Sequence, residues 1–267
     1  MYKNLKQKYG KTALVAGASE GLGAAFAEYL AAEDMDLILL ARRLQPLQHL
    51  ADKLKEKYKV NVTCISCDLG DINAPKKIEA VLAERSVNIL VYNAAKSYIG
   101  PFTDNPAENN SYAARVNMMT PLHMVQMFGE KMLARKKGAI ILMTSMAGLQ
   151  GSGYLAVYAA TKAFLRVLSE SLWYEWKTRG VNIIGCCAGA TSTPGYLKSD
   201  PGTSGFFAPR VLTPGKVVKE CFRKLGKRPS FITGRGNRLA SFIMYRMLPR
   251  KMAVNIMGNT IMKMYRL

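Results

Sequence analysis

Residues 11–23 read KTALVAGASEGLG, a short apolar run that ends among glycines. The apolar part is typical of a buried strand, and AAFAEYLAAE (residues 24–33) continues with helical spacing. Gly17, Gly21 and Gly23 give the spacing G-x-x-x-G-x-G, which differs from the common G-x-G-x-x-G. In either spacing, glycine lets the backbone turn tightly and approach a pyrophosphate, and the next helix offers its first N–H groups to the anion. The stretch therefore predicts a dinucleotide-binding turn, with a tight turn that binds nothing as the alternative.

Strand-length apolar runs and amphipathic helical stretches alternate along the rest of the chain. Strands are predicted at 36–41, 60–69, 88–95, 138–145, 181–189 and 230–234, and helices at 47–59, 78–85, 112–135, 157–179 and 213–227. This alternation implies right-handed βαβ crossovers and a parallel sheet that is covered on both faces. We therefore predict an α/β fold: a Rossmann-type doubly wound parallel sheet with helices on both faces, in a single domain that spans residues 1–267.

The end of the second predicted strand indicates which dinucleotide would bind. An NAD site usually offers a carboxylate there to the ribose 2′-OH, about 20 residues after the glycine motif. Here the strand ends in LLARR, and Arg42 and Arg43 stand where the acid would be expected. Because arginine prefers a phosphate partner, the 2′-phosphate of NADP is favoured, with plain surface charge as the alternative. Asp68, at the end of the third strand, is a candidate for the adenine edge.

A tyrosine and a lysine stand four residues apart in YAATK (158–162). Residues at this spacing share one face of a helix. A free phenol has a pKa of about 10 and transfers protons poorly near neutrality. A nearby ammonium favours the phenolate, so Lys162 is predicted to lower the pKa of Tyr158 toward a useful range for acid–base catalysis. For an isolated Tyr-x-x-x-Lys, the alternative is a buried tyrosine beside a solvated lysine.

Together, these motifs resemble the short-chain dehydrogenase/reductase family over nearly the whole chain. GASEGLG matches its glycine motif and YAATK its Tyr-x-x-x-Lys, while Asn117 in RVNMM and Ser145 in MTSMAG match its asparagine and serine. The resemblance implies that Tyr158 is the acid–base group and that Lys162 also holds the nicotinamide ribose. It implies that Ser145 hydrogen-bonds the substrate oxygen and that Asn117 holds a proton-relaying water. The residues expected to contact NADP(H) are Gly17, Ser19, Glu20, Gly21, Leu22, Gly23, Arg42, Arg43, Asp68, Leu69, Asn93, Tyr158, Lys162, Thr191 and Thr193.

Three departures from the family pattern fall near the expected cofactor. YNAA (92–95) replaces the usual Asn-Asn-Ala-Gly, so Tyr92 and Ala95 are expected to change the sheet contacts and the cofactor wall. Ala-Gly replaces Pro-Gly at 188–189, and Ala16 stands where threonine is common. These changes leave the acid–base group intact.

Substrate recognition is expected in residues 192–212 and in the C-terminal extension, residues 239–267. Pro, Gly and Ser punctuate the first segment, which predicts a loop that serves as a lid. Within it, Tyr196, Phe206 and Phe207 suit a large apolar ketone. The extension is basic and rich in methionine, which predicts helices packed on the domain or on a neighbouring subunit. The alternative is an amphipathic segment resting on anionic lipid, as a peripheral membrane contact.

The N-terminal part and the tail resemble the branch of hydroxysteroid dehydrogenases and long-chain 3-oxoacyl reductases. This implies an NADP(H)-dependent oxidoreductase that acts on the ketone or secondary alcohol of a bulky apolar molecule, a steroid or bile acid. A homodimer or homotetramer is the family precedent. The alternatives are a 3-oxoacyl thioester reductase and a non-catalytic dinucleotide-binding sensor, although a sensor would be expected to lose Tyr158 or Lys162.

The charge of the chain is unusual for a soluble enzyme. The 267 residues carry a formal net charge of +20, and residues 198–267 contain 15 Lys or Arg against only Asp200 and Glu220. Such a charge suits a nucleic acid, an anionic membrane or an anionic substrate, as well as a simple solvated surface. No nucleic-acid motif is present, so no nucleic-acid partner is predicted.

The cysteines and the apolar runs bear on location and metal binding. Five cysteines do not suggest a disulfide framework, and no run of 18 apolar residues is present, so a cytoplasmic protein is predicted. CISC (64–67) lies in a strand-like run rather than at a helix start, and His49 and His123 have no ligand-like spacing. No metal site is therefore predicted.

Overall fold

A seven-stranded parallel sheet forms the centre of the protein. The structure is a computed structural model that describes residues 4–82, 85–199, 202 and 210–267. The strand order of the sheet is β3-β2-β1-β4-β5-β6-β7, so the predicted doubly wound α/β fold is confirmed. The strands are β1 (Thr12–Ala16), β2 (Asp36–Ala41), β3 (Val62–Ser66), β4 (Ile89–Tyr92), β5 (Gly138–Ser145), β6 (Val181–Ala188) and β7 (Ser230–Ile232). The order reverses direction between β1 and β4, and sheets of this kind bind ligands at the carboxyl ends of the strands beside that point.

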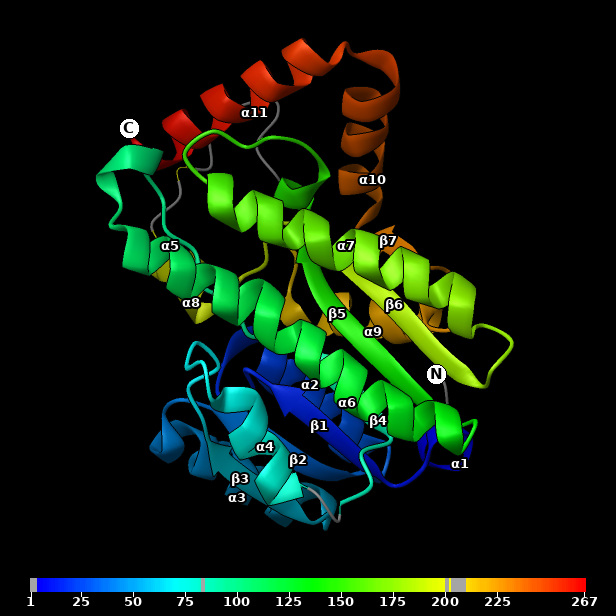
Figure 1. Cartoon of the computed structure of the whole chain (residues 1–267). Coiled ribbons are helices and arrows are strands. Elements are labelled where there is room, and N and C mark those ends of the chain that lie inside the picture. The colour runs from blue at the N-terminus through cyan, green and yellow to red at the C-terminus, as the bar shows by residue number, and fades with distance from the viewer. Residues whose placement is uncertain (1–3, 83–84, 200–201, 203–209) are drawn as a thin grey trace.

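Helices cover both faces of the sheet (Figure 1). One face carries α2 (Gly21–Ala32), α3 (Leu44–Tyr58) and α9 (Pro214–Lys224), and the other carries α4 (Ala74–Leu82), α5 (Ala107–Ala114), α6 (Thr120–Ala134) and α7 (Ala156–Trp176). A short helix, α1 (Leu5–Tyr9), precedes β1. The first face is held by Phe222 of α9, which meets Phe26 edge-on at 5.9 Å and stacks on Tyr29 at 4.5 Å. Phe128 and Leu165 are fully buried on the second face. The central strands are mostly apolar because both faces are covered.

The predicted long helix over residues 112–135 is interrupted. A π-helical turn, η2 (Arg115–Met119), separates α5 from α6. Its Val116 carbonyl accepts a hydrogen bond of 2.6 Å from the buried hydroxyl of Tyr92, which reaches across from β4. Tyr92, the first departure from the family pattern, therefore ties the sheet to this turn. Single π turns inside helices are frequent at functional sites, and this one carries Asn117.

Residues 192–199, part of the segment predicted to be a loop, contain a short helix. The region expected to be a loop contains α8 (Pro194–Lys198), whose first turn is capped because Thr193 Oγ1 accepts the Tyr196 N–H at 3.2 Å. Phe206 and Phe207 lie outside the described residues. The C-terminal extension forms α10 (Arg235–Phe242), the π turn η4 (Ile243–Met247) and α11 (Arg250–Tyr265), which lie together at one end of the molecule in Figure 1. Among the helices described, none has the length and apolar character needed to span a bilayer.

Candidate active site

A cavity of about 790 Å³ opens at the carboxyl ends of the central strands. It is lined by segments far apart in sequence: the glycine loop after β1, the ends of β2 to β6, the start of α7, and the C-terminal helices. Fifteen of the seventeen predicted site residues line it: Gly17, Ser19, Glu20, Gly21, Leu22, Arg42, Arg43, Asp68, Leu69, Asn93, Ser145, Tyr158, Lys162, Thr191 and Thr193. The two that do not are Gly23 and Asn117.

Glycine is required in the turn after β1 for two reasons. Gly17 has φ +77° and Gly21 has φ +60°, in the region that L side chains rarely adopt. A Cβ on Gly23 would lie 1.9 Å from the Gly17 carbonyl oxygen. Gly23 was predicted to contact the cofactor, but it lies in the first turn of α2, is buried, and lets the helix pack against the loop. The packing role of Gly23 follows from this contact, and its contact with the cofactor stays a prediction.

The glycine loop is held by residues from two other segments. Asn93 Nδ2 donates to the Gly17 carbonyl at 2.9 Å from the end of β4. A Cβ on Gly21 would lie 2.9 Å from Thr193 Cβ, so the loop after β6 closes directly over it. No side chain caps the N-terminus of α2. Gly21 and Leu22, the first residues of α2, line the cavity, so an anion bound there would be stabilised by the helix dipole.

The two arginines after β2 are tied to the rest of the cavity wall. Arg43 pairs with Glu20 of the glycine loop at 2.9 Å, with both side chains about half exposed. Arg42 Nη1 donates to the Tyr112 hydroxyl at 3.1 Å, and that hydroxyl donates to Asp68 Oδ1 at 2.8 Å. Tyr112 lies on α5 and was not predicted, because nothing in the local pattern distinguishes it from a packing tyrosine.

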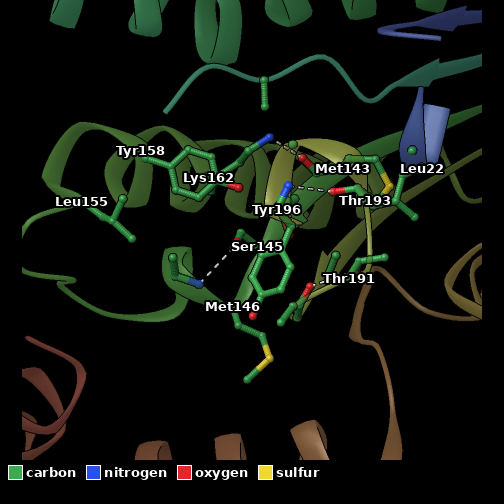
Figure 2. Close-up of a pocket in the computed structure, with 18 of the residues that line it drawn as sticks. Leu22, Met143, Ser145, Met146, Leu155, Tyr158, Lys162, Thr191, Thr193 and Tyr196 are labelled. Atoms are coloured by element: carbon green, nitrogen blue, oxygen red, sulfur yellow. Dashed lines mark hydrogen bonds between the residues drawn. The ribbon is translucent and has the colours of Figure 1, made fainter. Parts of the chain in front are cut away.

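The predicted acid–base group lies at the centre of the cavity (Figure 2). Tyr158 and Lys162 come from α7, and Ser145 comes from the end of β5. Ser145 Oγ accepts the Ala147 N–H at 3.2 Å, and its own O–H donates to the Tyr158 oxygen. Lys162 is 2% exposed, and its Nζ donates to the Met143 carbonyl at 2.8 Å.

The prediction that Lys162 lowers the pKa of Tyr158 is wrong for this arrangement. Burial raises the pKa of Tyr158, a hydrogen bond with Ser145 partly offsets this, and Tyr265 of α11 adds a smaller upward effect. The ammonium of Lys162 points to the Met143 carbonyl and lies 5.7 Å from the centre of the Tyr158 ring. Burial also lowers the pKa of Lys162 to about 8. Desolvation therefore decides the proton affinity of both groups, and it favours their neutral forms.

The lowered pKa of Lys162 predicts a pH-dependent stability. Between the pKa of about 8 in the folded state and the ordinary 10.5, the unfolded chain binds the extra proton, so the free energy of unfolding rises with pH. From pH 7 to 10, this group is expected to add about 2–3 kcal/mol to the wild type relative to Lys162→Met. Urea unfolding of both proteins at several pH values measures the difference, which cancels the titration of all other groups. Parallel pH profiles would contradict the assigned burial of the ammonium.

Asn117 does not line the cavity but connects the segments that form its wall. The residue is fully buried, its Oδ1 accepts the Lys96 N–H at 2.8 Å, and its Nδ2 donates to the Lys96 carbonyl at 2.7 Å. Nδ2 also lies 3.2 Å from Thr161 Oγ1 on α7. The amide thus joins η2, the segment after β4 and the catalytic helix. The predicted proton-relaying water stays a prediction.

The C-terminal extension completes the cavity. Its lining residues are mostly apolar: Leu239, Ala240, Ile243, Met244, Ile256, Met257, Ile261 and Met264, together with Thr260 and Tyr265. Met244, Ile261 and Met264 are buried, which supports the prediction that the extension packs on the domain. The sequence pattern could not locate this contact, because a helix shows which of its faces is apolar but not which part of the fold that face meets.

A family model and relatives of two kinds match the chain. The model of the short chain dehydrogenase family matches residues 11–201. The 7beta-hydroxysteroid dehydrogenase of Collinsella aerofaciens is 32% identical over 237 residues, which cover 88% of this chain and 90% of that protein. The Very-long-chain 3-oxoacyl-CoA reductase-B of Danio rerio is 34% identical over 178 residues, covering 65% of this chain and 57% of that protein.

Solved structures agree with these relatives. A structure from a study of 7beta-hydroxysteroid dehydrogenase stereoselectivity superposes with a TM-score of 0.89 at 30% identity, covering 95% of this chain and 99% of that chain. The short-chain dehydrogenase from Sphingobium yanoikuyae in complex with NADPH superposes with a TM-score of 0.74 at 27% identity, covering 84% and 87%. The sheet order, the glycine turn and the extent of these matches together show that the chain belongs to the short-chain dehydrogenase family.

Proposed function

We propose that the protein is an NADP(H)-dependent oxidoreductase that interconverts a ketone and a secondary alcohol on a bulky apolar substrate, specifically a steroid or bile acid. The observation that carries this proposal is the apolar wall that α10 and α11 place over Ser145 and Tyr158. A mostly apolar cavity with a few convergent polar groups is typical of a small-molecule site, and its volume of about 790 Å³ lies within the range of about 300–1,000 Å³ for such sites.

The residues around the glycine turn fit a phosphorylated dinucleotide. The N-terminus of α2 and the close approach allowed by Gly17 and Gly21 suit the pyrophosphate. Arg42 and Arg43 suit a 2′-phosphate, because guanidinium groups bind phosphate oxygens in pairs. Thr191 and Thr193, on the loop after β6, stand at the wall expected for the nicotinamide. When bound, NADP(H) supplies or accepts the hydride.

The pKa of Tyr158 suits the reduction direction. Because burial raises this pKa, the phenol is protonated at neutral pH and can donate its proton to a substrate carbonyl oxygen. The O–H of Ser145, which faces Tyr158, donates to the same oxygen when a substrate is bound and stabilises the negative charge that develops there. Lys162 holds the nicotinamide ribose. In alcohol oxidation, Tyr158 accepts the proton of the substrate hydroxyl.

A 3-oxoacyl thioester reductase is the second candidate. The Danio rerio relative carries that name, and the same acid–base group serves both reactions. The match to that relative covers 65% of this chain, whereas the hydroxysteroid dehydrogenase match covers 88%, and the superposed structure from the stereoselectivity study covers 95%. A non-catalytic sensor is disfavoured because Ser145, Tyr158 and Lys162 all meet in the cavity.

The direct test follows NADPH oxidation optically across keto steroids, keto bile acids, 3-oxoacyl thioesters and small ketones. The proposal expects kcat/KM to be highest for the steroid or bile-acid ketones. Comparable rates on small ketones alone, with no turnover of steroids, would overturn the substrate class. Turnover restricted to 3-oxoacyl thioesters would establish the second candidate instead.

The apolar wall provides a separate prediction. Met257→Trp adds a large ring to the cavity side of α11. It is expected to lower kcat/KM for a steroid ketone by about 10-fold or more, because overpacking costs about 1–3 kcal/mol, while a small ketone still fits. Steady-state kinetics on both substrates measure the ratio, with Met252→Trp, on an exposed position of the same helix, as the control. Equal losses on the two substrates would indicate damage to the fold rather than a substrate wall.

Assembly and location stay predictions that specific surfaces support. Val167 and Tyr174 on the outer face of α7 are exposed, which suits the predicted homodimer or homotetramer built on the long helices. Leu239, Phe242 and Met247 are exposed on the C-terminal extension, which also suits the predicted contact with an anionic membrane surface. A cytoplasmic location and the single-domain organisation likewise stay as predicted.

A further inference from the structure

The cavity has a second polar region besides the predicted cofactor and acid–base residues. Most side chains contributed by the C-terminal helices are apolar, but Arg210 and Asn237 also line the wall near the N-terminus of α10. The only acidic residues among the described lining are Glu20 and Asp68, and both belong to the predicted cofactor side. The part of the cavity near α10 is therefore positively charged.

The side chain of Arg210 lies against the first turn of α10. A Cβ built on Gly236 would lie 2.9 Å from Arg210 Cδ and 3.2 Å from its Nε, so the arginine side chain passes close to this glycine. The side chain is exposed to solvent and to the cavity. Within the described part of the chain, no carboxylate forms an ion pair with it. Its guanidinium is thus available to a ligand.

Asn237 gives an independent indication of a missing acceptor. The residue is 3% exposed, and its Nδ2 has no hydrogen-bond partner among the described residues. The amide packs against Gly189, where an added Cβ would lie 2.4 Å from Nδ2. A buried donor without a partner is destabilising, so an acceptor atom on a ligand that reaches Nδ2 would be stabilised there. Both Asn237 and the neighbouring Gly236 belong to the first turn of α10, whose dipole also favours an anion.

We propose that Arg210 and Asn237 form a subsite for an anionic group of the substrate, namely a carboxylate on an otherwise apolar ketone. The subsite deepens the proposed function and rests on it, because it selects acidic substrates such as bile acids over neutral steroids. Guanidinium binds a carboxylate through two parallel hydrogen bonds, a geometry that an ester cannot reproduce with the same charge. The phosphates of an acyl thioester share this anionic chemistry, so the test includes them.

The test compares 7-ketolithocholate, its methyl ester and a 3-oxoacyl-CoA in the wild type, Arg210→Gln and Arg235→Gln. The change at Arg210 keeps a polar side chain and removes the charge. Arg235 is the matched control, because it opens the same helix but lines a separate surface depression formed by Arg223, Lys224, Lys227, Arg228 and Arg238. Binding of each probe is measured by calorimetry, and kcat and KM are measured by following NADPH oxidation.

The wild type is expected to prefer the acid over the ester by about 10- to 100-fold in kcat/KM, the range for hydrogen bonds to charged groups. Arg210→Gln should abolish most of this preference through a higher KM for the acid, because the anchor binds ground state and transition state alike. Arg235→Gln should keep the preference. Asn237→Leu should weaken the acid and the ester alike, because the ester carbonyl also accepts its hydrogen bond.

The outcomes separate this inference from the proposed function. If the wild type reduces the acid and the ester equally, or if both arginine variants lose the preference equally, the subsite is overturned while the oxidoreductase stands. If no ketone is reduced but the acid binds and Arg210→Gln weakens that binding, the subsite stands and the proposed function falls. If only the 3-oxoacyl-CoA depends on Arg210, this arginine binds a phosphate of the coenzyme A group, and the proposed carboxylate subsite is overturned. Neither binding nor turnover of any probe would overturn both proposals.

Discussion

Tyr158→Phe is expected to lower kcat by at least about 100-fold, the low end for general acid–base catalysis. The substitution removes the hydroxyl proton and keeps the ring, which lies in the cavity beside Ser145. The binding of NADPH should change little, because the ring still fills the same space on α7. Steady-state kinetics on the best ketone of the panel and a fluorescence titration of NADPH separate the two effects.

Tyr154→Phe is the matched control for this experiment. Tyr154 lies four residues earlier, just before α7, and is not among the residues that line the cavity. Its variant should keep near-wild-type kcat. Near-wild-type turnover by Tyr158→Phe would remove this tyrosine from the chemistry. An equal loss in both variants would point instead to a disturbed start of α7.

The double variant Arg42→Ala, Arg43→Ala is expected to weaken NADPH far more than NADH. Two charge-assisted contacts to a 2′-phosphate, discounted for solvent exposure, correspond to about 30- to 1000-fold preference for NADPH in the wild type. NADH has no 2′-phosphate and therefore loses little. The pair of Arg43 with Glu20 places this result toward the lower end, because Glu20 competes with the phosphate for the guanidinium.

Titration of both cofactors into the wild type and the double variant measures this preference. Arg179→Ala, Arg228→Ala removes the same charge from exposed positions outside the cavity and should keep the wild-type ratio. If the wild type binds NADH as tightly as NADPH, or if the Arg42 and Arg43 variant loses both cofactors equally, the two arginines are surface charge and the cofactor assignment fails.

The sequence predicted the parts of this protein that depend on local periodicity. Apolar runs of strand length, separated by amphipathic helices, require a parallel sheet covered on both faces, and the order found for β1 to β7 confirms it. The positive φ angles of Gly17 and Gly21 are of the same local kind, because only glycine turns a strand into a helix so tightly. The four-residue spacing of Tyr158 and Lys162 placed both on the cavity side of α7 for the same reason.

Tertiary structure decided the chemistry that those residues experience. The spacing of Tyr158 and Lys162 predicted a lowered tyrosine pKa, yet the pKa is raised. The pKa of a side chain depends on its burial by every segment packed around it. Here the ammonium of Lys162 donates to the Met143 carbonyl, and Tyr265 of α11 raises the pKa of Tyr158 further. The same physics explains why Tyr112, Arg210 and Asn237 escaped prediction. Each acquires its setting from contacts between segments distant in sequence, whereas the strand order and the glycine turn follow from residues that are neighbours along the chain.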